Sequence, residues 1–196
     1  MYPLIEFSGD DGSEHAVMQG RVSAIACARR TDCGAFVDQL LLPEHEEDSE
    51  FHVGKHRVRR KVAVHQIGLV SRKATVLAQL SVRDNIALLE PAGPARKRFW
   101  RAVDQALDDT GLLAGVDPGY IVSGLPWHMQ VEINFLQMWL RHPECMLFDR
   151  VYEHDDADNL LHLPQLFRRR YPLRAVCYLQ RGALPAGLGV TDVVHL

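Results

Sequence analysis

The chain has 196 residues, of which 47% are hydrophobic, and it carries a formal net charge of −3 at pH 7. A chain of this size can bury one sizeable core, and its acidic balance argues against a general nucleic-acid binder, because phosphate backbones demand a basic surface. No stretch approaches the roughly 20 consecutive apolar residues that cross a bilayer, and residues 1–6 do not have the pattern of a signal peptide. We therefore expect a single domain over residues 1–196, located in the cytoplasm.

Cysteine and histidine spacing predicts no metal site. The cysteines form no CxxC pair, and Cys145 and Cys177 lie in apolar runs where a thiol packs as a small hydrophobic group. The best candidate clusters are His154 beside Asp155 and Asp156, and the pair His52 and His56. However, Gly54 lies between them in an alternating, strand-like stretch, where this spacing does not place both rings on one helix face. We expect reduced, structural cysteines and no bound metal.

Strand, loop and helix follow one another near the N-terminus. The apolar runs at residues 4–7 and 22–28 predict strands. Residues 29–34 are polar and contain a glycine, which predicts a loop, and the apolar residues at helical spacing from Phe36 to Leu41 predict a helix.

The middle of the chain predicts a hairpin, a further strand and two helices. Residues 51–58 alternate around a glycine, as is typical of a hairpin, and residues 62–70 predict a strand. Ser81 suits the N-cap of the first helix. The second, amphipathic helix runs through residues 96–107 and ends at Gly111; its basic first turn is most simply a solvated face.

A buried strand with an acid at its end is the main feature of the last third. A strongly apolar helix at residues 131–140 ends before Pro143, and residues 145–149 then predict a fully buried strand that ends at Asp149. Sheets of α/β proteins place their chemistry at such carboxyl ends. A helix and two strands complete the chain, at residues 160–167, 173–179 and 193–196. The alternation predicts an α/β fold with a mostly parallel sheet.

Three stretches carry the most specific motifs. The first reads IGLV at residues 67–70 and LSVRDNI at residues 80–86, the second reads LPWHM at residues 125–129 and HPE at residues 142–144, and the third is the strand at residues 145–149. Together they resemble the ATP-binding subunits of ABC transporters, most closely those of Mce-type bacterial lipid-trafficking importers. The matching family elements are IGxVFQ with LTVRENV, LSGGM with RRPELLLLDEP, and the strand that presents the magnesium-organising acid.

The resemblance covers most of the chain, although the match before Ile67 is weak and the segment there looks shortened. It implies a shortened ABC ATPase fold of the P-loop NTPase type, with a mostly parallel sheet and a small helical subdomain at about residues 72–130. Because ATP sites of this family are shared across a dimer, pairing with an intact subunit would leave both sites incomplete.

The stretch that corresponds to the family's phosphate-binding loop lacks the groups that such a loop needs. A P-loop uses glycines, which let backbone N–H groups approach the phosphates, and a Lys followed by Ser or Thr. Here Gly34 is the only glycine, and no GKS or GKT occurs anywhere in the chain. Asp32, near the N-terminus of the following helix, would occupy the helix amides and repel a triphosphate. The degenerate loop comprises Ala28, Arg29, Arg30, Thr31, Asp32, Cys33, Gly34 and Ala35.

The resemblance implies that the other catalytic positions are also changed. It places Arg72 at the Q-loop glutamine, Arg150 at the general base and Gln180 at the switch histidine, while Asp149 is retained. The signature loop has lost its serine and glycines and consists of Leu125, Pro126, Trp127, His128 and Met129. Loss of a general base alone costs about 10²–10⁴ in rate. We therefore expect no catalytic residue and negligible hydrolysis.

The expected function is that of a pseudo-ATPase that binds a transporter permease or a partner subunit, with a structural or regulatory role in lipid-type transport. In the resembling family, the groove near the Q-loop and the small helical subdomain receives a permease helix, which implies contacts through Val76, Leu77, Leu80 and the helix at residues 96–107. The short Val76-Leu77 run could equally pack in the protein's own core. A homodimer is a further arrangement. We expect no cofactor, and contact with the inner membrane only through a partner.

Three alternatives stay open. The chain could be a nucleotide-binding ABC transporter subunit with residual ATP binding or hydrolysis, which would use ATP, magnesium and Asp149. Arg29 and Arg30 could recruit an anion at the adjacent helix end. The basic run at residues 55–61 could bind nucleic acid, but the acidic segment at residues 44–50 is close in sequence and balances it, so we expect no nucleic-acid partner.

Overall fold

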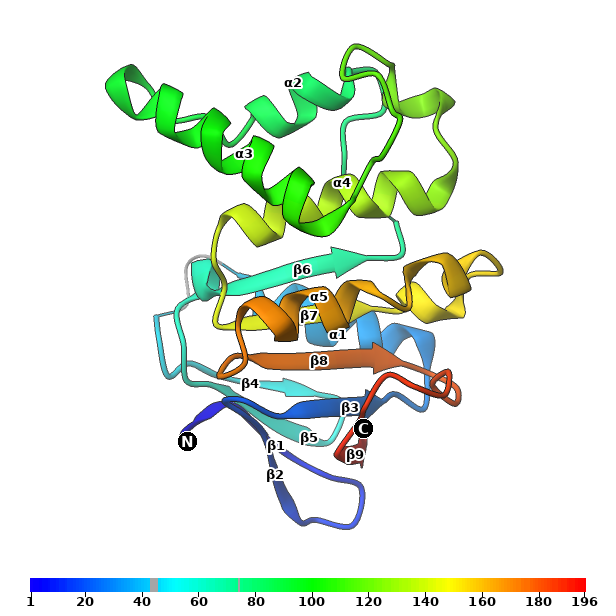
Figure 1. Ribbon diagram of the computed structural model, residues 1–196. Coiled ribbons are helices and arrows are strands. Elements are labelled where there is room, and N and C mark those ends of the chain that lie inside the picture. The colour runs from blue at the N-terminus through cyan, green and yellow to red at the C-terminus, as the bar shows by residue number, and fades with distance from the viewer. Residues whose placement is uncertain (43–45, 74) are drawn as a thin grey trace.

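An antiparallel sheet and a parallel sheet organise the fold (Figure 1). The computed structural model describes residues 1–42, 46–73 and 75–196, so part of the predicted acidic segment 44–50 lies outside the described residues. The antiparallel sheet has the strand order β2-β1-β5-β4 and consists of β1 (Pro3–Ser8), β2 (Glu14–Met18), β4 (Glu50–Val53) and β5 (His56–Arg60). The parallel sheet has the order β6-β7-β8-β3-β9 and consists of β3 (Val22–Ala26), β6 (Ile67–Ser71), β7 (Cys145–Asp149), β8 (Ala175–Gln180) and β9 (Asp192–His195).

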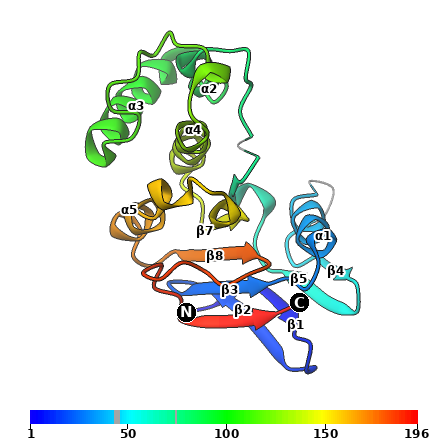
Figure 2. The same ribbon diagram turned by 90° about the vertical axis from the view of Figure 1, so that its right-hand side faces the viewer.

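Both faces of the central part of the parallel sheet are covered, so β3, β7 and β8 are buried at nearly every position. Figure 2 shows α1 (Arg30–Leu40) on one side of the sheet and α4 (Trp127–Leu140) and α5 (Leu163–Arg170) on the other. Side chains alternate along a strand. Phe148 therefore packs in the core beneath α4 and α5, whereas its neighbour Leu147 packs in the core shared with α1 and the antiparallel sheet. The predicted α/β class with a mostly parallel sheet is confirmed.

Two helices lie beyond α4, at the end of the molecule opposite the antiparallel sheet (Figure 1). They are α2 (Val82–Ala87) and α3 (Arg96–Thr110). Ser81 caps α2, because its Oγ accepts a hydrogen bond from the Asp84 N–H at 3.1 Å. Gly111 ends α3 with a φ of 68°, a left-handed conformation that favours glycine. Both helices fall within residues 72–130, where a helical subdomain is predicted.

The structure corrects several predicted boundaries. The strand predicted over residues 62–70 begins only at Ile67, because Val64–Gln66 form a 3-10 turn. The strand predicted over residues 22–28 ends at Ala26. The sequence did not predict β2, since within this strand only Val17 is buried and the other positions are exposed or half-buried, which leaves no clear alternation.

Candidate functional site

The carboxyl ends of the central parallel strands bring together most of the residues that the sequence singled out. The strands β7, β8 and β3 are neighbours and end at Asp149, Gln180 and Ala26. Figure 2 shows this edge of the sheet facing the viewer. In open α/β sheets, ligands bind in the crevice beyond the carboxyl ends of the strands. This edge is therefore the candidate site.

The connection from β3 to α1 is short. Residues 27–29 are the only ones between the strand and the helix, so residues 30–35, predicted as part of a loop, form the first turns of α1 instead. The reason is Asp32, whose carboxylate accepts a hydrogen bond from the Arg29 N–H at 3.1 Å and closes the first helical turn. A phosphate-wrapping loop needs more chain than this connection contains.

The three amides of this connection are all occupied. The Cys27 N–H donates to the Gln180 carbonyl at 2.9 Å, and the Ala28 N–H donates to the Leu196 carbonyl at 2.8 Å. The third amide is that of Arg29, which donates to the Asp32 carboxylate. Anion sites at helix N-termini depend on several N–H groups that converge on the ligand. Residues 27–29 have no such N–H group to offer, and the Asp32 carboxylate lies in the first turn of α1, where it disfavours an anion.

A buried ion pair lies at the end of β7. Arg150 donates from Nε to Asp149 Oδ1 at 2.8 Å and from Nη2 to Asp149 Oδ2 at 3.3 Å, and the Ser71 hydroxyl donates to Oδ2 at 3.1 Å. The side chains of Asp149 and Arg150 are only 5% and 10% exposed. This two-pronged contact is the strong form of an arginine–carboxylate pair. The hydrogen bond to Asp149 raises the pKa of the Arg150 guanidinium.

The backbone at Arg150 is unusual for a residue other than glycine. Its φ is 51°, in the left-handed region, which costs of order 1–3 kcal/mol. The Arg150 N–H donates to the Leu179 carbonyl at 2.7 Å, so the next strand holds this conformation in place. The guanidinium therefore stays on both oxygens of the one acid that the resemblance assigns to magnesium.

A second acid extends this network. Glu153 accepts hydrogen bonds from the Arg181 N–H at 2.9 Å and from Arg181 Nη2 at 3.0 Å, and its carboxylate lies 3.7 Å from Arg72 Nη1. Burial raises the pKa of Glu153, but the hydrogen bonds from Arg181 outweigh it and hold the pKa below its ordinary value. We call these five residues the acid–arginine cluster: Arg72, Asp149, Arg150, Glu153 and Arg181. Glu153 and Arg181 were not predicted, because their only signal in the sequence is their place shortly after a strand end.

Gln180, at the predicted switch position, is buried at the end of β8. Its Nε2 donates to the Gly182 carbonyl at 2.6 Å, so the side chain is bonded to the loop that follows its own strand. The four cysteines of the chain are buried with no disulfide.

The predicted signature segment is the start of α4. Leu125 precedes the N-cap, which is Pro126, and the helix begins at Trp127, four residues before the predicted start. His128 and Met129 therefore also lie in its first turn. The Trp127 indole N–H donates to the Arg72 carbonyl at 2.8 Å.

The Trp127 ring is also held by a second contact. It stacks on the His154 ring with centroids 3.7 Å apart and an interplanar angle of 7°. Arg72 belongs to the acid–arginine cluster and His154 directly follows Glu153 in the sequence, so these two contacts place Trp127 of α4 beside the cluster.

A buried amide network supports the predicted partner-binding segment. The Leu77 N–H donates to Asn85 Oδ1 at 2.8 Å, and Asn85 Nδ2 donates back to the Leu77 carbonyl at 3.0 Å. Leu77 is 50% exposed, whereas Val76 packs against the core and Leu80 is half-buried. Of the three predicted residues, only Leu77 is exposed to solvent.

A cavity of about 860 Å³ adjoins the same edge, between β3, β9 and residues 181–190. Its walls are mostly apolar and include Leu184 and Leu188, while Asp10, Arg181 and His195 are among the polar residues that line it. Such walls suit apolar groups rather than a triphosphate, which needs converging N–H groups or cations.

The basic run at residues 55–61 is neutralised by neighbouring acids. Arg60 turns inward and donates to the Leu40 carbonyl at 2.8 Å. The exposed cations form the pairs Lys55–Asp10 at 2.9 Å, Arg57–Glu14 at 2.8 Å, Arg59–Glu50 at 3.0 Å and Lys61–Asp48 at 3.0 Å. This pairing leaves little basic surface for a phosphate backbone.

Two further observations concern metals and membranes. Among the residues that the structure describes, no three His, Cys, Asp or Glu side chains gather in a way that could hold a metal ion. Within the same residues, no helix has the length and apolar character needed to cross a bilayer.

The two sheets and the helices inserted between β6 and β7 form an ABC ATPase fold of the P-loop NTPase type. The structure is similar to that of CbiO1 from Clostridium perfringens, which is part of the ABC transporter complex CbiONQ. The TM-score is 0.67 at 12% sequence identity, and the likeness covers 93% of this chain and 80% of that chain. No family model matches the chain, and no curated protein sequence does. At this identity the likeness concerns the fold alone, and it confirms the predicted fold class.

Proposed function

We propose that the chain is a non-catalytic ABC ATPase-like subunit, a pseudo-ATPase that works by binding a transporter permease or a partner subunit. One observation carries the proposal: the Arg150 guanidinium covers both oxygens of Asp149, in the place where the family's acid organises magnesium. The occupied amides of residues 27–29 support it, because nucleotide binding in this fold needs the phosphate loop and the metal together.

The energies favour the closed arrangement. Magnesium could bind Asp149 only after the Arg150 guanidinium leaves both carboxylate oxygens. The two charge-assisted hydrogen bonds lost in that step would weaken the net affinity for the metal. Asp32 adds repulsion of a triphosphate at the helix end.

Hydrolysis is disfavoured independently of binding. A general base must accept a proton from water near neutral pH. Arg150 stands where the resemblance expects that base, and its guanidinium, with a pKa raised by Asp149, stays protonated. Gln180 at the switch position is bonded to the Gly182 carbonyl.

The partner that we propose is a membrane permease, which would hold this cytoplasmic chain at the inner membrane. CbiO1, which shares the fold, is part of an ABC transporter complex, and this supports a transporter partner in general terms. The LSVRDNI motif at residues 80–86 supports a lipid-type transporter of the Mce kind. The exposed Leu77 would be the central contact, with Val76 and Leu80 beside it.

Co-purification tests this proposal. The chain is expressed with a tagged ABC permease of the Mce type, and both ATP turnover and capture are measured. We expect capture with no phosphate release above that of buffer. Leu77→Glu abolishes capture, while Leu173→Glu, at a leucine that is 74% exposed and far along the chain, leaves it intact. Equal capture of both variants, or steady ATP turnover, would contradict the proposal.

A second candidate is a nucleotide-binding subunit with residual ATP binding or hydrolysis. The fold shared with CbiO1 and the retained Asp149 favour it. It requires the Arg150 side chain to move away when magnesium arrives. Magnesium-dependent ATP binding that Asp149→Asn abolishes would favour this candidate over the first.

A further inference from the structure

The turn between α2 and α3 projects at the far end of the helical region (Figure 1). It includes the 3-10 turn Gly93–Ala95. Leu88 is 57% exposed, and Pro91, Ala92 and Pro94 are exposed beside it. Four uncharged side chains therefore form a small apolar crown at the end of the molecule.

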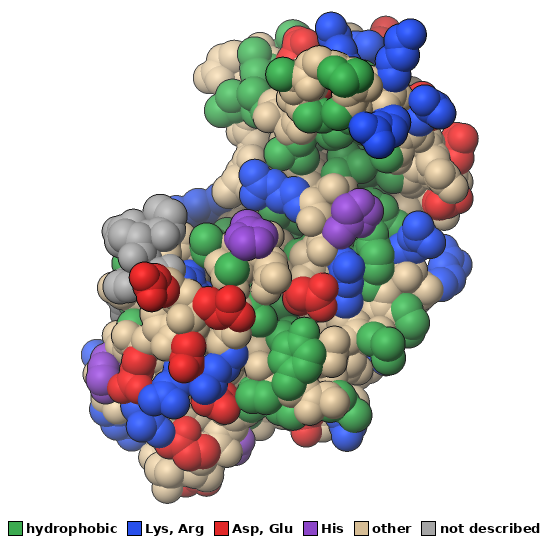
Figure 3. All heavy atoms as spheres, turned by 90° about the vertical axis from the view of Figure 1, so that its left-hand side faces the viewer, with side chains coloured by type: hydrophobic (Ala, Val, Ile, Leu, Met, Phe, Trp, Pro, Cys, Tyr) green, Lys and Arg blue, Asp and Glu red, His purple; other side chains and the backbone are tan. Residues whose placement is uncertain are grey.

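Cations surround this crown. Four residues at the start of α3 have exposed side chains: Arg96, Lys97, Arg98 and Arg101. Figure 3 shows Lys and Arg side chains gathered over this end of the molecule, with apolar side chains between them. Arg96 pairs with Glu90. Within the part of the chain that the structure describes, Lys97, Arg98 and Arg101 form no ion pair, unlike the basic strand β5, whose exposed cations are matched by acids.

Helix stability does not account for these charges. The N-terminus of a helix carries a partial positive charge, which makes cations there unfavourable and anions favourable. In α3 the order is reversed, because the cations occupy the first turns while Asp104, Asp108 and Asp109 occupy the second half. The arginines of α5, Arg168 to Arg170, lie in the last turn of their helix, where the dipole favours them.

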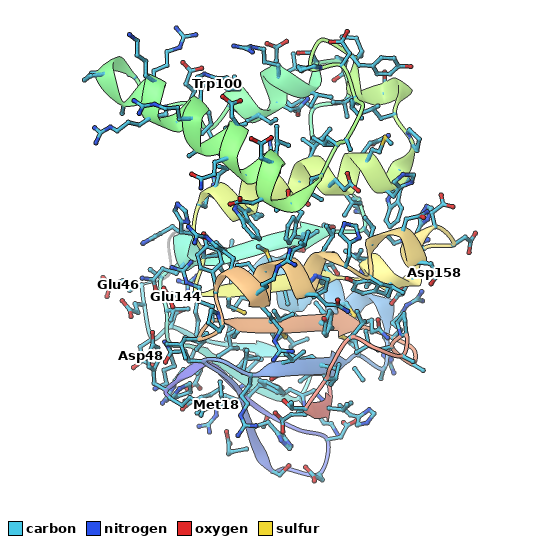
Figure 4. All side chains as sticks on the ribbon, viewed as in Figure 1. Met18, Glu46, Asp48, Trp100, Glu144 and Asp158 are labelled. Atoms are coloured by element: carbon cyan, nitrogen blue, oxygen red, sulfur yellow. The ribbon has the colours of Figure 1, made fainter. Side chains whose placement is uncertain are left out.

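The tip is also held in a fixed shape. Figure 4 shows Trp100 between α2 and α3. Its indole N–H donates to the Glu90 carboxylate at 2.9 Å, and the Arg83 guanidinium lies 4.4 Å from the centre of its ring. Phe99 packs edge-on against Trp100. These contacts direct the aromatic rings inward, so the cations and the apolar crown are what the tip presents.

We propose that this basic tip, defined as Leu88, residues 91–94, Arg96, Lys97, Arg98 and Arg101, binds the surface of an anionic lipid bilayer. An apolar projection surrounded by cations suits binding to a bilayer surface. The apolar side chains enter the membrane interface, and each nearby cation increases binding to anionic headgroups by a factor of about five. A nucleic acid fits less well, because the tip is a projection rather than a groove. The net charge of −3 also includes the cations of the tip, so the remainder of the chain carries a larger negative charge. This membrane contact does not depend on the proposed function. It would be a direct contact with the bilayer, in addition to the predicted contact with the membrane through a partner.

Vesicle co-sedimentation of the full chain tests the inference. We expect binding to vesicles of phosphatidylcholine with phosphatidylglycerol, weakened by salt, and little binding to phosphatidylcholine alone. The variant K97Q/R98Q/R101Q lowers the partition coefficient about 100-fold, since three factors of about five are lost. Leu88→Ser lowers it by roughly five-fold, because an apolar side chain leaves the interface.

The matched control is R168Q/R169Q/R170Q, which removes the same charge from α5 and changes binding less than about three-fold. Circular dichroism and thermal unfolding of each variant establish that it is folded. Equal losses in the two triple variants, or equal binding to neutral vesicles, would overturn the inference. Tighter binding of transfer RNA than of anionic vesicles, lost in K97Q/R98Q/R101Q, would overturn it in favour of a nucleic-acid partner.

Discussion

Basic side chains do opposite things at two ends of this molecule. At the carboxyl edge of the parallel sheet, Arg150 and Arg181 are bonded to Asp149 and Glu153, so their charges are paired within the fold. At the basic tip, the cations face solvent, and most have no acid beside them within the described residues. An arginine in the sequence therefore does not by itself indicate a binding site. Its partner in the fold decides whether its charge is neutralised or remains available to a ligand.

Removal of the buried Arg150 side chain is expected to lower the free energy of unfolding more than any other substitution considered. Arg150→Ala leaves the Asp149 carboxylate buried without its cation and lowers the free energy of unfolding by about 3–5 kcal/mol. Arg98→Ala, at the basic tip, changes it by less than about 0.5 kcal/mol. Urea unfolding at neutral pH measures both. Equal, small effects would remove the distinction between the two regions.

A second substitution identifies the cause of that loss. Adding Asp149→Asn to the Arg150→Ala variant removes the stranded charge, so part of the stability returns. If the double variant is as unstable as the sum of the two single variants, the loss comes from packing rather than from an uncompensated carboxylate.

A smaller effect is expected at the start of α1. Asp32→Ala removes the acceptor of the Arg29 N–H and costs about 1 kcal/mol, as the loss of a helix cap does. In a chain of this length the melting temperature falls by about 2–4 °C, which differential scanning calorimetry measures. An unchanged melting temperature would show that the Asp32 carboxylate does not sequester the amide.

Glu153 makes the stability of the fold depend on pH. The folded pKa of Glu153 lies below its ordinary value of 4.5 because Arg181 donates to it. As the pH falls, the unfolded chain takes up this proton first, so the contribution of Glu153 is fully present above about pH 4.5 and is lost as the pH falls through the folded pKa. Urea midpoints across this range measure the slope. Glu153→Gln flattens it, and a slope that stays the same would assign the acid sensitivity to other groups.

Removal of the cations at the basic tip is expected to stabilise the protein slightly. K97Q/R98Q/R101Q removes cations from the N-terminal turns of α3, where they oppose the helix dipole, and raises the free energy of unfolding by about 0.3–1 kcal/mol. Urea unfolding at low salt measures the change. A loss of stability would mean that these side chains have stabilising contacts within the fold.

Local signals in the sequence were enough for most elements of the fold. The continuous apolar run of β7 and the cap at Ser81 depend only on neighbouring residues, and the helix stop at Gly111 depends on one backbone angle that glycine adopts easily. The start of α1 was missed because Thr31, Asp32 and their neighbours favour loops, and only the bond between Asp32 and the Arg29 N–H commits them to a helix.

The candidate site was less accessible to sequence reasoning. The resemblance indicated that Arg150 replaces an expected acid, but not that its side chain would bend back over Asp149 from a left-handed backbone. The Glu153–Arg181 pair joins residues that are 28 positions apart, which no periodicity reveals. Contacts of this kind exist only once the strands β7 and β8 lie side by side.

Isothermal titration of Mg-ATP into the full chain tests the central claim most directly, that the sheet edge is closed to a triphosphate. With the Asp149–Arg150 pair intact and the amides of residues 27–29 occupied, we predict no binding heat and a dissociation constant weaker than about 1 mM. A micromolar, magnesium-dependent dissociation constant that is lost in Asp149→Asn would contradict the account.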